Sequence, residues 1–227
     1  MVAVKGIIFD FDGVLVNSMP VHYEAWKTAF MEICSLQVNE RTVYLLEGMR
    51  GVDLVKEIFR VFNYNELSKV ESVTKLKDQI FRSMIDRVDS YPGTEELVKG
   101  LTCIKGIASG SARHDIESIL KRSFQQSLFQ IILTGDSIEQ GKPDPQAFQI
   151  FLQKSNIDSK NVIVVENSPL GVKAAIRAGL RAIVVLNNSP LVRDDFIDLV
   201  SLDEIFVETK NTKSLLFDWC KNSQVSR

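Results

Sequence analysis

The sequence predicts an α/β protein, with a doubly wound parallel sheet and an inserted all-helical module. Short runs rich in Val and Ile alternate with helical patterns along most of the chain. These runs are apolar throughout, which is typical of strands buried on both faces. Between residues 18 and 88 the strand-like runs stop and only helical patterns occur, which indicates a helical insertion after the first strand.

Six runs are predicted to be strands because each is short, apolar and closed by polar residues or Gly. They cover residues 4–9, 104–108, 131–133, 161–165, 181–186 and, more weakly, 204–207. Between them, apolar residues recur three and four positions apart, as on one face of a helix. These helical patterns cover residues 93–101, 112–123, 144–155 and 169–180. The alternation predicts βαβ units and hence a Rossmann-like sheet covered on both sides.

The break in the pattern also predicts the domain division. Residues 1–16 and 89–227 are expected to form the α/β core domain, and residues 17–88 a helical cap domain. Pro92 and Gly93 mark the return of the chain to the core.

Composition excludes several classes of function. The 227 residues are 45% hydrophobic and 25% charged, which suits a globular protein with one large domain and a smaller inserted one. A net charge of -2 gives no basic surface for nucleic acid. No apolar run reaches the roughly 20 residues of a membrane span, and Asp10 and Asp12 interrupt the early apolar stretch before a signal peptide could form. We therefore expect a cytoplasmic protein, a monomer or weak dimer, that binds neither nucleic acid nor membranes.

Histidine and cysteine content argues against a zinc site. The three cysteines are far apart in the sequence and form no CxxC pair, and there are only two histidines. A metal, if present, is expected to bind oxygen ligands.

Polar side chains follow several predicted strands at the point where each strand ends. Asp10 and Asp12 follow the first strand, Ser109 follows the second, and Glu166 and Asn167 follow the fourth. Ligands of doubly wound sheets bind at the carboxyl ends of the strands. Because an isolated buried carboxylate is costly, these acids are expected to face a crevice where a divalent cation and a lysine neutralise them.

These residue types together suit phosphoryl transfer. A carboxylate can attack phosphorus, and a second one can protonate the leaving oxygen and then activate water. Mg²⁺ prefers oxygen ligands together with substrate phosphate. Lys142, in "GKPDP", and a serine hydroxyl can neutralise and hydrogen-bond the phosphoryl oxygens.

Four segments, "DFDGVLVNS", "ASGSAR", "GKPDP" and "VVENSPLGVKAAIRAG", resemble in sequence and order the four motifs of the haloacid dehalogenase superfamily. A helical cap placed directly after the first motif resembles the subgroup of β-phosphoglucomutase, phosphoglycolate phosphatase and sugar phosphatases. The resemblance covers essentially the whole chain. It implies a Mg²⁺-dependent enzyme that acts on a small phosphorylated metabolite. Dehalogenase members lack the second aspartate, so Asp12 favours phosphoryl transfer.

The resemblance also implies the roles of the core residues. Asp10 would be the nucleophile and a metal ligand, and Asp12 the general acid and base, with its carbonyl on the metal. Ser109 and Lys142 would bind the phosphoryl group. Glu166 and Asn167 would complete the metal site. The family usually has an acid at the position of Asn167, so one negative charge is missing here.

Five further residues are implied to contact substrate, four of them because they match the first cap helix and the cap loop of this subgroup. They are Ser18, His22, Gly48, Arg50 and, after Ser109, Gly110. Ser18 could equally serve the hinge, His22 could act through the general acid and base, and Arg50 could be a plain surface residue.

Three functions remain open from the residues. A mutase must hold a bisphosphate at both ends, yet Glu47 stands before the cap-loop glycine where mutase-like members carry a lysine. This favours a phosphatase for phosphoglycolate or a sugar phosphate that works through an aspartyl-phosphate. His22 points instead to a β-phosphoglucomutase-type enzyme. A catalytically dead binding protein is the third reading, and the complete set of catalytic residues argues against it.

Overall fold

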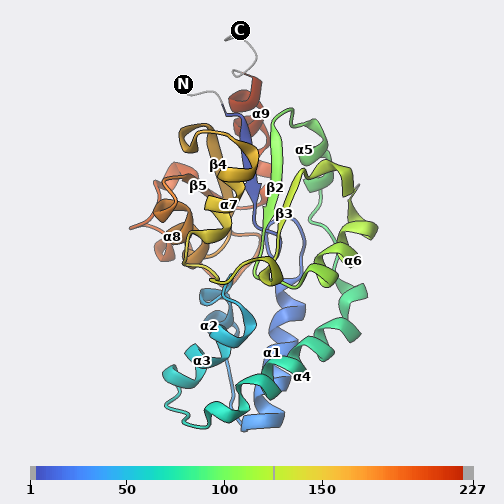
Figure 1. Cartoon of the computed structure of the whole chain (residues 1–227), viewed down its shortest axis with the longest axis vertical. Coiled ribbons are helices and arrows are strands. Elements are labelled where there is room, and N and C mark those ends of the chain that lie inside the picture. The colour runs from blue at the N-terminus through green and yellow to red at the C-terminus, as the bar shows by residue number, and fades with distance from the viewer. Residues whose placement is uncertain (1–3, 125, 222–227) are drawn as a thin grey trace.

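The computed structural model describes residues 4–124 and 126–221. Within these residues six strands form one sheet in the order β3-β2-β1-β4-β5-β6, and every neighbouring pair is parallel. Helices cover both faces of this sheet, and a separate group of helices lies beyond one end of it (Figure 1). The predicted α/β fold class is confirmed.

The strands lie where the sequence predicts them, with ends that move by one or two residues. They are β1 (Gly6–Phe9), β2 (Ile104–Ala108), β3 (Ile131–Leu133), β4 (Val162–Glu166), β5 (Arg181–Val185) and β6 (Ile205–Phe206). β1 is shorter than predicted because the N–H of Val4 donates to the carbonyl of Trp219, in the last helix, and not to a neighbouring strand.

Two apolar clusters form the core, one on each face of the sheet. In β1, Ile7 and Phe9 belong to one cluster and Ile8 to the other, and all three are fully buried. Burial of each such side chain stabilises the fold by about 1.5–3 kcal/mol. The helices on the first face are α5 (Thr94–Gly100), α6 (Arg113–Ser123) and α9 (Lys213–Lys221), and those on the second are α7 (Gln146–Ser155) and α8 (Pro169–Arg177).

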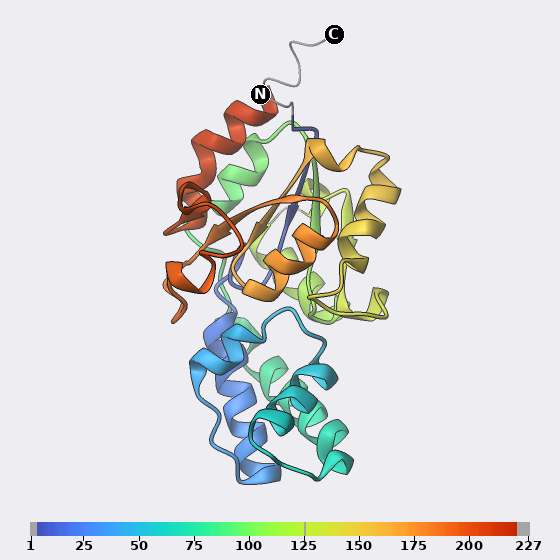
Figure 2. The same cartoon turned by 90° about the vertical axis from the view of Figure 1, so that its left-hand side faces the viewer.

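Four helices between β1 and β2 form the inserted module. They are α1 (Met19–Cys34), α2 (Glu40–Leu45), α3 (Gly51–Val61) and α4 (Val70–Ser83). Figure 2 shows them as a group beyond the sheet. They have an apolar cluster of their own, which includes Phe30 and Ile58. We call residues 17–88 the cap; the bounds of this domain stay a prediction.

Two chain segments join the cap to the core, and they run side by side. The N–H of Asn17 donates to the carbonyl of Asp89 at 2.8 Å, and the N–H of Tyr91 donates to that of Leu15 at 3.1 Å. Val16 and Ser90 form an antiparallel bridge between them. This paired connection places the cap over the edge of the sheet where β1 ends.

No helix in the described part of the chain is both long and apolar enough to cross a membrane. Cys103 and Cys220 are distant in sequence, but their Sγ atoms lie 3.0 Å from each other.

Candidate active site

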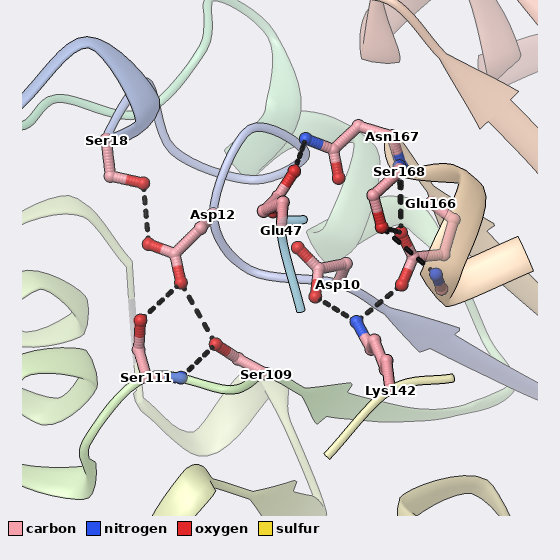
Figure 3. Close-up of polar contacts among 11 residues, drawn as sticks. Asp10, Asp12, Ser18, Glu47, Ser109, Ser111, Lys142, Glu166, Asn167 and Ser168 are labelled. Carbon is pink, nitrogen blue, oxygen red and sulfur yellow. Dashed lines mark hydrogen bonds and ion pairs between the residues drawn. The ribbon is translucent and has the colours of Figure 1, made fainter. Parts of the chain in front are cut away.

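The parallel register brings the predicted catalytic residues to one edge of the sheet. In the ladder Phe9 pairs with Ile107 of β2 and with Val165 of β4. The residues that follow these three positions therefore emerge together at the carboxyl ends of the central strands, as expected for a doubly wound fold. Figure 3 shows Asp10, Ser109 and Glu166 converging there.

Asp10 and Glu166 share one ammonium group. Lys142 Nζ forms ion pairs with Asp10 Oδ1 and with Glu166 Oε1 (Figure 3), and all three residues are buried. Burial alone would lower the pKa of Lys142, but the two carboxylates raise it above its ordinary value. Burial raises the pKa of Asp10 to about 8, with Glu166 adding to this rise and Lys142 opposing it. One lysine thus faces more negative charge than it can neutralise.

Asp12 lies in a different environment, because four neutral groups surround its carboxylate. Ser18 Oγ at 2.6 Å and His22 Nε2 at 3.0 Å bond to its Oδ1, and Ser111 Oγ at 2.7 Å and Ser109 Oγ at 3.0 Å donate to its Oδ2. Burial tends to raise the pKa of Asp12. The hydrogen bonds from His22 and the serine hydroxyls outweigh burial and hold this pKa well below its usual range. Asp12 is therefore ionised and fully hydrogen-bonded.

His22 holds Asp12 from the cap side. Its ring stacks on Phe81 with centroids 4.0 Å apart and planes 8° apart. Burial, followed by the nearby charge of Lys77, lowers the pKa of His22 below 6.5. A neutral ring can donate to a carboxylate only through N–H, so Nε2 carries the proton toward Asp12. Together with Ser18, which is fully buried, His22 therefore positions Asp12.

The fourth motif forms a tight turn at the end of β4. Glu166 Oε2 accepts from the N–H groups of Asn167 at 3.0 Å and Ser168 at 3.2 Å, and from Ser168 Oγ at 3.1 Å. Ser168 Oγ in turn accepts from the N–H of Gly171 at 3.1 Å and caps α8. Both oxygens of Glu166 are thus occupied, one by this turn and one by Lys142.

Two buried oxygen atoms at this edge have no hydrogen-bond partner among the described residues: Asp10 Oδ2 and Asn167 Oδ1. Leaving such an atom unpaired costs about 1–3 kcal/mol. Within the described ranges no group of three or more His, Cys, Asp or Glu side chains is arranged to hold a metal. The unpaired oxygens are nevertheless the hard ligands that Mg²⁺ prefers. The chemistry of the residues therefore fits this cation.

Glu47 is a site residue for which the sequence suggested no direct contact. It lies in the cap between α2 and α3, is 8% exposed, and accepts from Asn167 Nδ2 at 2.6 Å. Burial raises the pKa of Glu47 well above its ordinary value, and the charges of Asp10 and Glu166 add to the rise.

A cavity of about 300 Å³ lies between cap and core above these groups. The predicted site residues that line it are Asp10, Asp12, His22, Gly48, Arg50, Ser109 and Gly110. Lys142, Glu166 and Asn167 lie buried beside Asp10, and Ser18 lies behind Asp12. The structure thus brings the predicted residues together. The hydroxyl of Ser18, however, donates to Asp12 and not toward the cavity.

Sequence reasoning assigned no role to Ser111 or to a polar face of α4. Thr74, Lys77 and Asp78 of α4 line the cavity. Lys77 Nζ lies 5.0 Å from the ring centroids of Trp26 and Phe81 and 3.4 Å from Asp78. The three- and four-residue spacing of Thr74, Lys77 and Asp78 places them on one helix face, which the sequence could have revealed.

Comparisons with known proteins agree with this geometry. A family model described as haloacid dehalogenase-like hydrolase matches residues 7–185. The chain is 25% identical over 181 residues to a phosphorylated carbohydrates phosphatase of Thermotoga maritima, covering 79% of this chain and 83% of that protein. It is 25% identical over 183 residues to a fructose-1-phosphate phosphatase of Escherichia coli, covering 79% and 95%. A structure titled putative beta-phosphoglucomutase, from Bacteroides vulgatus, shares the fold, with a TM-score of 0.82, 23% identity and coverage of 98% and 90%.

Proposed function

The chain belongs to the haloacid dehalogenase-like hydrolases, and we propose that it is a Mg²⁺-dependent phosphatase that hydrolyses a sugar phosphate or a similar small phosphate ester. The family and its named phosphatases make the protein an enzyme of the haloacid dehalogenase type. The proposal includes the metal, the substrate and the chemical steps. It also includes a separate cap domain at residues 17–88, action in the cytoplasm, and a monomeric or weakly dimeric state.

One observation carries the proposal: Asp10, paired with Lys142, lies at the floor of the cavity beside the hydrogen-bonded Asp12. Lys142 opposes the rise in the pKa of Asp10 and can attract a phosphate dianion. Asp12 is two residues further along the chain, within reach of the leaving oxygen. A nucleophile, a cation and a second carboxylate are the groups that hydrolysis through an aspartyl-phosphate requires.

In the first step an oxygen of Asp10 attacks phosphorus and the bond from phosphorus to the ester oxygen breaks. Asp12, which is ionised before substrate binds, takes a proton from solvent as the substrate phosphate approaches and gives that proton to the leaving oxygen, which departs as an alcohol. The approach of a phosphate dianion favours the protonated form of Asp12, since a nearby negative charge raises the pKa of a carboxyl group. In the second step Asp12 takes a proton from water, the resulting hydroxide attacks phosphorus, and the bond to Asp10 breaks to release phosphate.

Asp10 Oδ2, Asn167 Oδ1 and the backbone carbonyl of Asp12 would hold the cation. When bound, Mg²⁺ supplies positive charge that offsets the repulsion between Asp10 and the substrate phosphate. Glu166 supports this arrangement from behind by fixing Lys142. Whether Glu166 also binds the metal directly stays a prediction.

The cap favours a phosphatase over a mutase. The cationic side chains that the cap contributes to the cavity are Arg50 and Lys77. Arg50 Nε donates to Asp53 at 2.9 Å, and Lys77 lies 3.4 Å from Asp78. A second phosphate would have to compete with these carboxylates and with the buried Glu47. An uncharged, hydroxyl-rich group meets no such repulsion, and the named relatives suit a carbohydrate phosphate.

A mutase of the β-phosphoglucomutase type is the second candidate, because His22 bonds Asp12 and because the fold matches a structure with that title. A single assay separates the two. Phosphate release is measured over a panel of sugar phosphates, sugar alcohol phosphates and phosphoglycolate, and glucose 1-phosphate is tested for isomerisation with a bisphosphate primer. We expect phosphate release from carbohydrate phosphates without isomerisation. Isomerisation faster than hydrolysis would establish the mutase, and no turnover of any compound would contradict both.

A further inference from the structure

The fourth motif of this chain lacks an acid at residue 167, and the structure shows what stands in its place. Asn167 is 2% exposed. Its Nδ2 donates to Glu47, while its Oδ1 has no partner among the described residues. An amide oxygen can bind a hard cation, but it brings no negative charge. The core alone therefore offers one charge less than the four motifs of the family normally supply.

Glu47 brings a negative charge to this position from the cap. Its Oε2 lies 2.6 Å from Asn167 Nδ2, and the side chain is more than nine-tenths buried. The next residue, Gly48, has a φ of +88°, and a Cβ there would lie 2.6 Å from Lys142 Cδ. Only glycine lets the loop pass this close to the lysine. The conformation of the loop thus delivers Glu47 to the core.

The core is shaped to receive the same loop. A Cβ on Gly110 would lie 3.0 Å from the carbonyl oxygens of Gly48 and Met49. The absence of a side chain at Gly110 allows the backbone of the cap loop to rest on the loop after β2. Glu47 therefore reaches Asn167 through a fitted contact between two backbones, and not through a long flexible side chain alone.

Negatively charged groups and buried oxygens without hydrogen-bond partners lie together at this contact. Asp10 and Glu166 both pair with Lys142, and Glu47 lies near enough for the charges of these three groups to act on its pKa. Figure 3 shows the unpaired oxygen of Asp10 and the side-chain oxygen of Asn167 pointing into the space beside Glu47. Neither of these two oxygens receives a hydrogen bond from a described residue, and several carboxyl groups lie nearby. A divalent cation is attracted to such a place, because it supplies the positive charge that hydrogen-bond donors do not.

We propose that Glu47 of the cap binds the divalent cation together with Asp10 and Asn167, and so replaces the acid that is missing at residue 167. The inference rests on the proposed function, because it assumes that the enzyme uses a divalent cation. The metal site then spans both domains.

The test measures cation affinity without any substrate. Mn²⁺ binding is followed by electron paramagnetic resonance, and Mg²⁺ affinity by its competition with Mn²⁺. Glu47→Gln keeps an oxygen that can accept from Asn167 and removes only the charge. We expect this variant to bind Mg²⁺ about tenfold more weakly or worse. The double variant Glu47→Gln with Asn167→Asp returns the charge from the core side, and we expect affinity within about threefold of the wild type.

Glu32→Gln is the matched control, because Glu32 is an exposed glutamate on α1 of the same cap; its affinity should equal that of the wild type. Circular dichroism confirms that each variant is folded, and the double variant separates lost charge from lost structure. Equal Mg²⁺ affinity in Glu47→Gln and the wild type would overturn the inference while leaving the proposed function in place. A wild type that binds neither cation would overturn both.

Discussion

Two carboxylates that only Phe11 separates in the sequence lie in opposite environments. Asp12 accepts four hydrogen bonds from neutral groups and is fully satisfied. Asp10 pairs with Lys142 and shares it with Glu166, and one oxygen of Asp10 has no partner among the described residues. We call Asp12 with its partners Ser18, His22, Ser109 and Ser111 the hydroxyl ring. We call Asp10 with Lys142 and Glu166 the charged cluster. Both oxygens of Asp12 have donors, whereas under the proposed function a cation and a phosphate would supply the partners that the charged cluster lacks.

This difference indicates which of the two aspartates suits attack on phosphorus and which suits proton transfer. Asp12 is held in place by its four hydrogen bonds, and its hydroxyl donors can rotate when it takes up or gives up a proton. A group with unpaired oxygens and excess charge binds its missing partner strongly, because a low-dielectric site magnifies the attraction. Under the proposed function, bond formation at phosphorus therefore belongs to the charged cluster and proton transfer to the hydroxyl ring.

The largest expected effect comes from Asp10→Asn. This substitution removes the nucleophile, so kcat should fall by about 10⁴-fold or more. Because it also removes one of two acids that share Lys142, the free energy of unfolding should stay within about 1 kcal/mol of the wild type or rise. Phosphate release and urea unfolding measure the two quantities. Activity within tenfold of the wild type would place the nucleophile elsewhere.

Lys142→Met tests the charged cluster through stability. It leaves Asp10 and Glu166 buried side by side without a cation, which should cost about 3–5 kcal/mol in the free energy of unfolding. Lys160→Met is the control, because Lys160 is exposed and lies 3.5 Å from Asp158 in a surface pair; it should cost less than about 1 kcal/mol. Equal losses in the two variants would show that the cluster is no more strained than a surface pair.

These two predictions use residues that the sequence identified, and the reason is physical. Asp10 and Lys142 belong to short motifs at strand ends, and a parallel sheet forces such positions together whatever the side chains around them do. The strands themselves were predictable because short continuous apolar runs, closed by polar residues or Gly, suit strands buried on both faces. β4 ends at Glu166, one residue beyond the prediction, because Glu166 still pairs with Val184 of β5 although it is not apolar.

The roles of Ser111 and Glu47 were not predictable in the same way. Each depends on where a side chain of a loop or of the cap points after the cap packs on the core. No periodicity in the sequence encodes the contact of Glu47 with Asn167, 120 residues away. Ser18 illustrates the converse, because its position in the first motif suggested contact with substrate or the hinge and its hydroxyl is used by Asp12.

A cation should stabilise the charged cluster and not the hydroxyl ring. At about 100 times its Kd, Mg²⁺ should raise the free energy of unfolding of the wild type by about 2.7 kcal/mol. Ser111→Ala, in the ring, should keep this gain, and Asp10→Asn should lose most of it. Urea unfolding with Mg²⁺ or with EDTA measures the difference. A gain in Asp10→Asn as large as in the wild type would move the cation away from Asp10.

The smallest expected effect belongs to the ring itself. Ser111→Ala removes one donor, at 2.7 Å, from the ionised Asp12, which should cost about 1.5 kcal/mol in the free energy of unfolding at neutral pH. Ser83→Ala, whose hydroxyl is exposed and donates to a backbone carbonyl of its own helix, should change stability by less than about 0.5 kcal/mol.

The pH dependence of the Ser111→Ala effect follows from the lowered pKa of Asp12. A depressed folded-state pKa gives stability that is present above the unfolded pKa and is lost as pH falls through the folded one. The gap between wild type and variant should therefore be constant near neutral pH and narrow in acid. A gap that widens on acidification would mean that Asp12 is protonated in the folded protein.

The most direct test of the account is the covalent intermediate. Asp12→Ala removes the group that activates water, so the enzyme should become phosphorylated slowly and then keep the phosphoryl group. Rapid acid quenching of this variant with a sugar phosphate and Mg²⁺, followed by mass spectrometry of its peptides, should find one added phosphoryl group on Asp10. Full turnover with the phosphoryl group on another residue, or hydrolysis at the wild-type rate with no adduct, would contradict the division between the charged cluster and the hydroxyl ring.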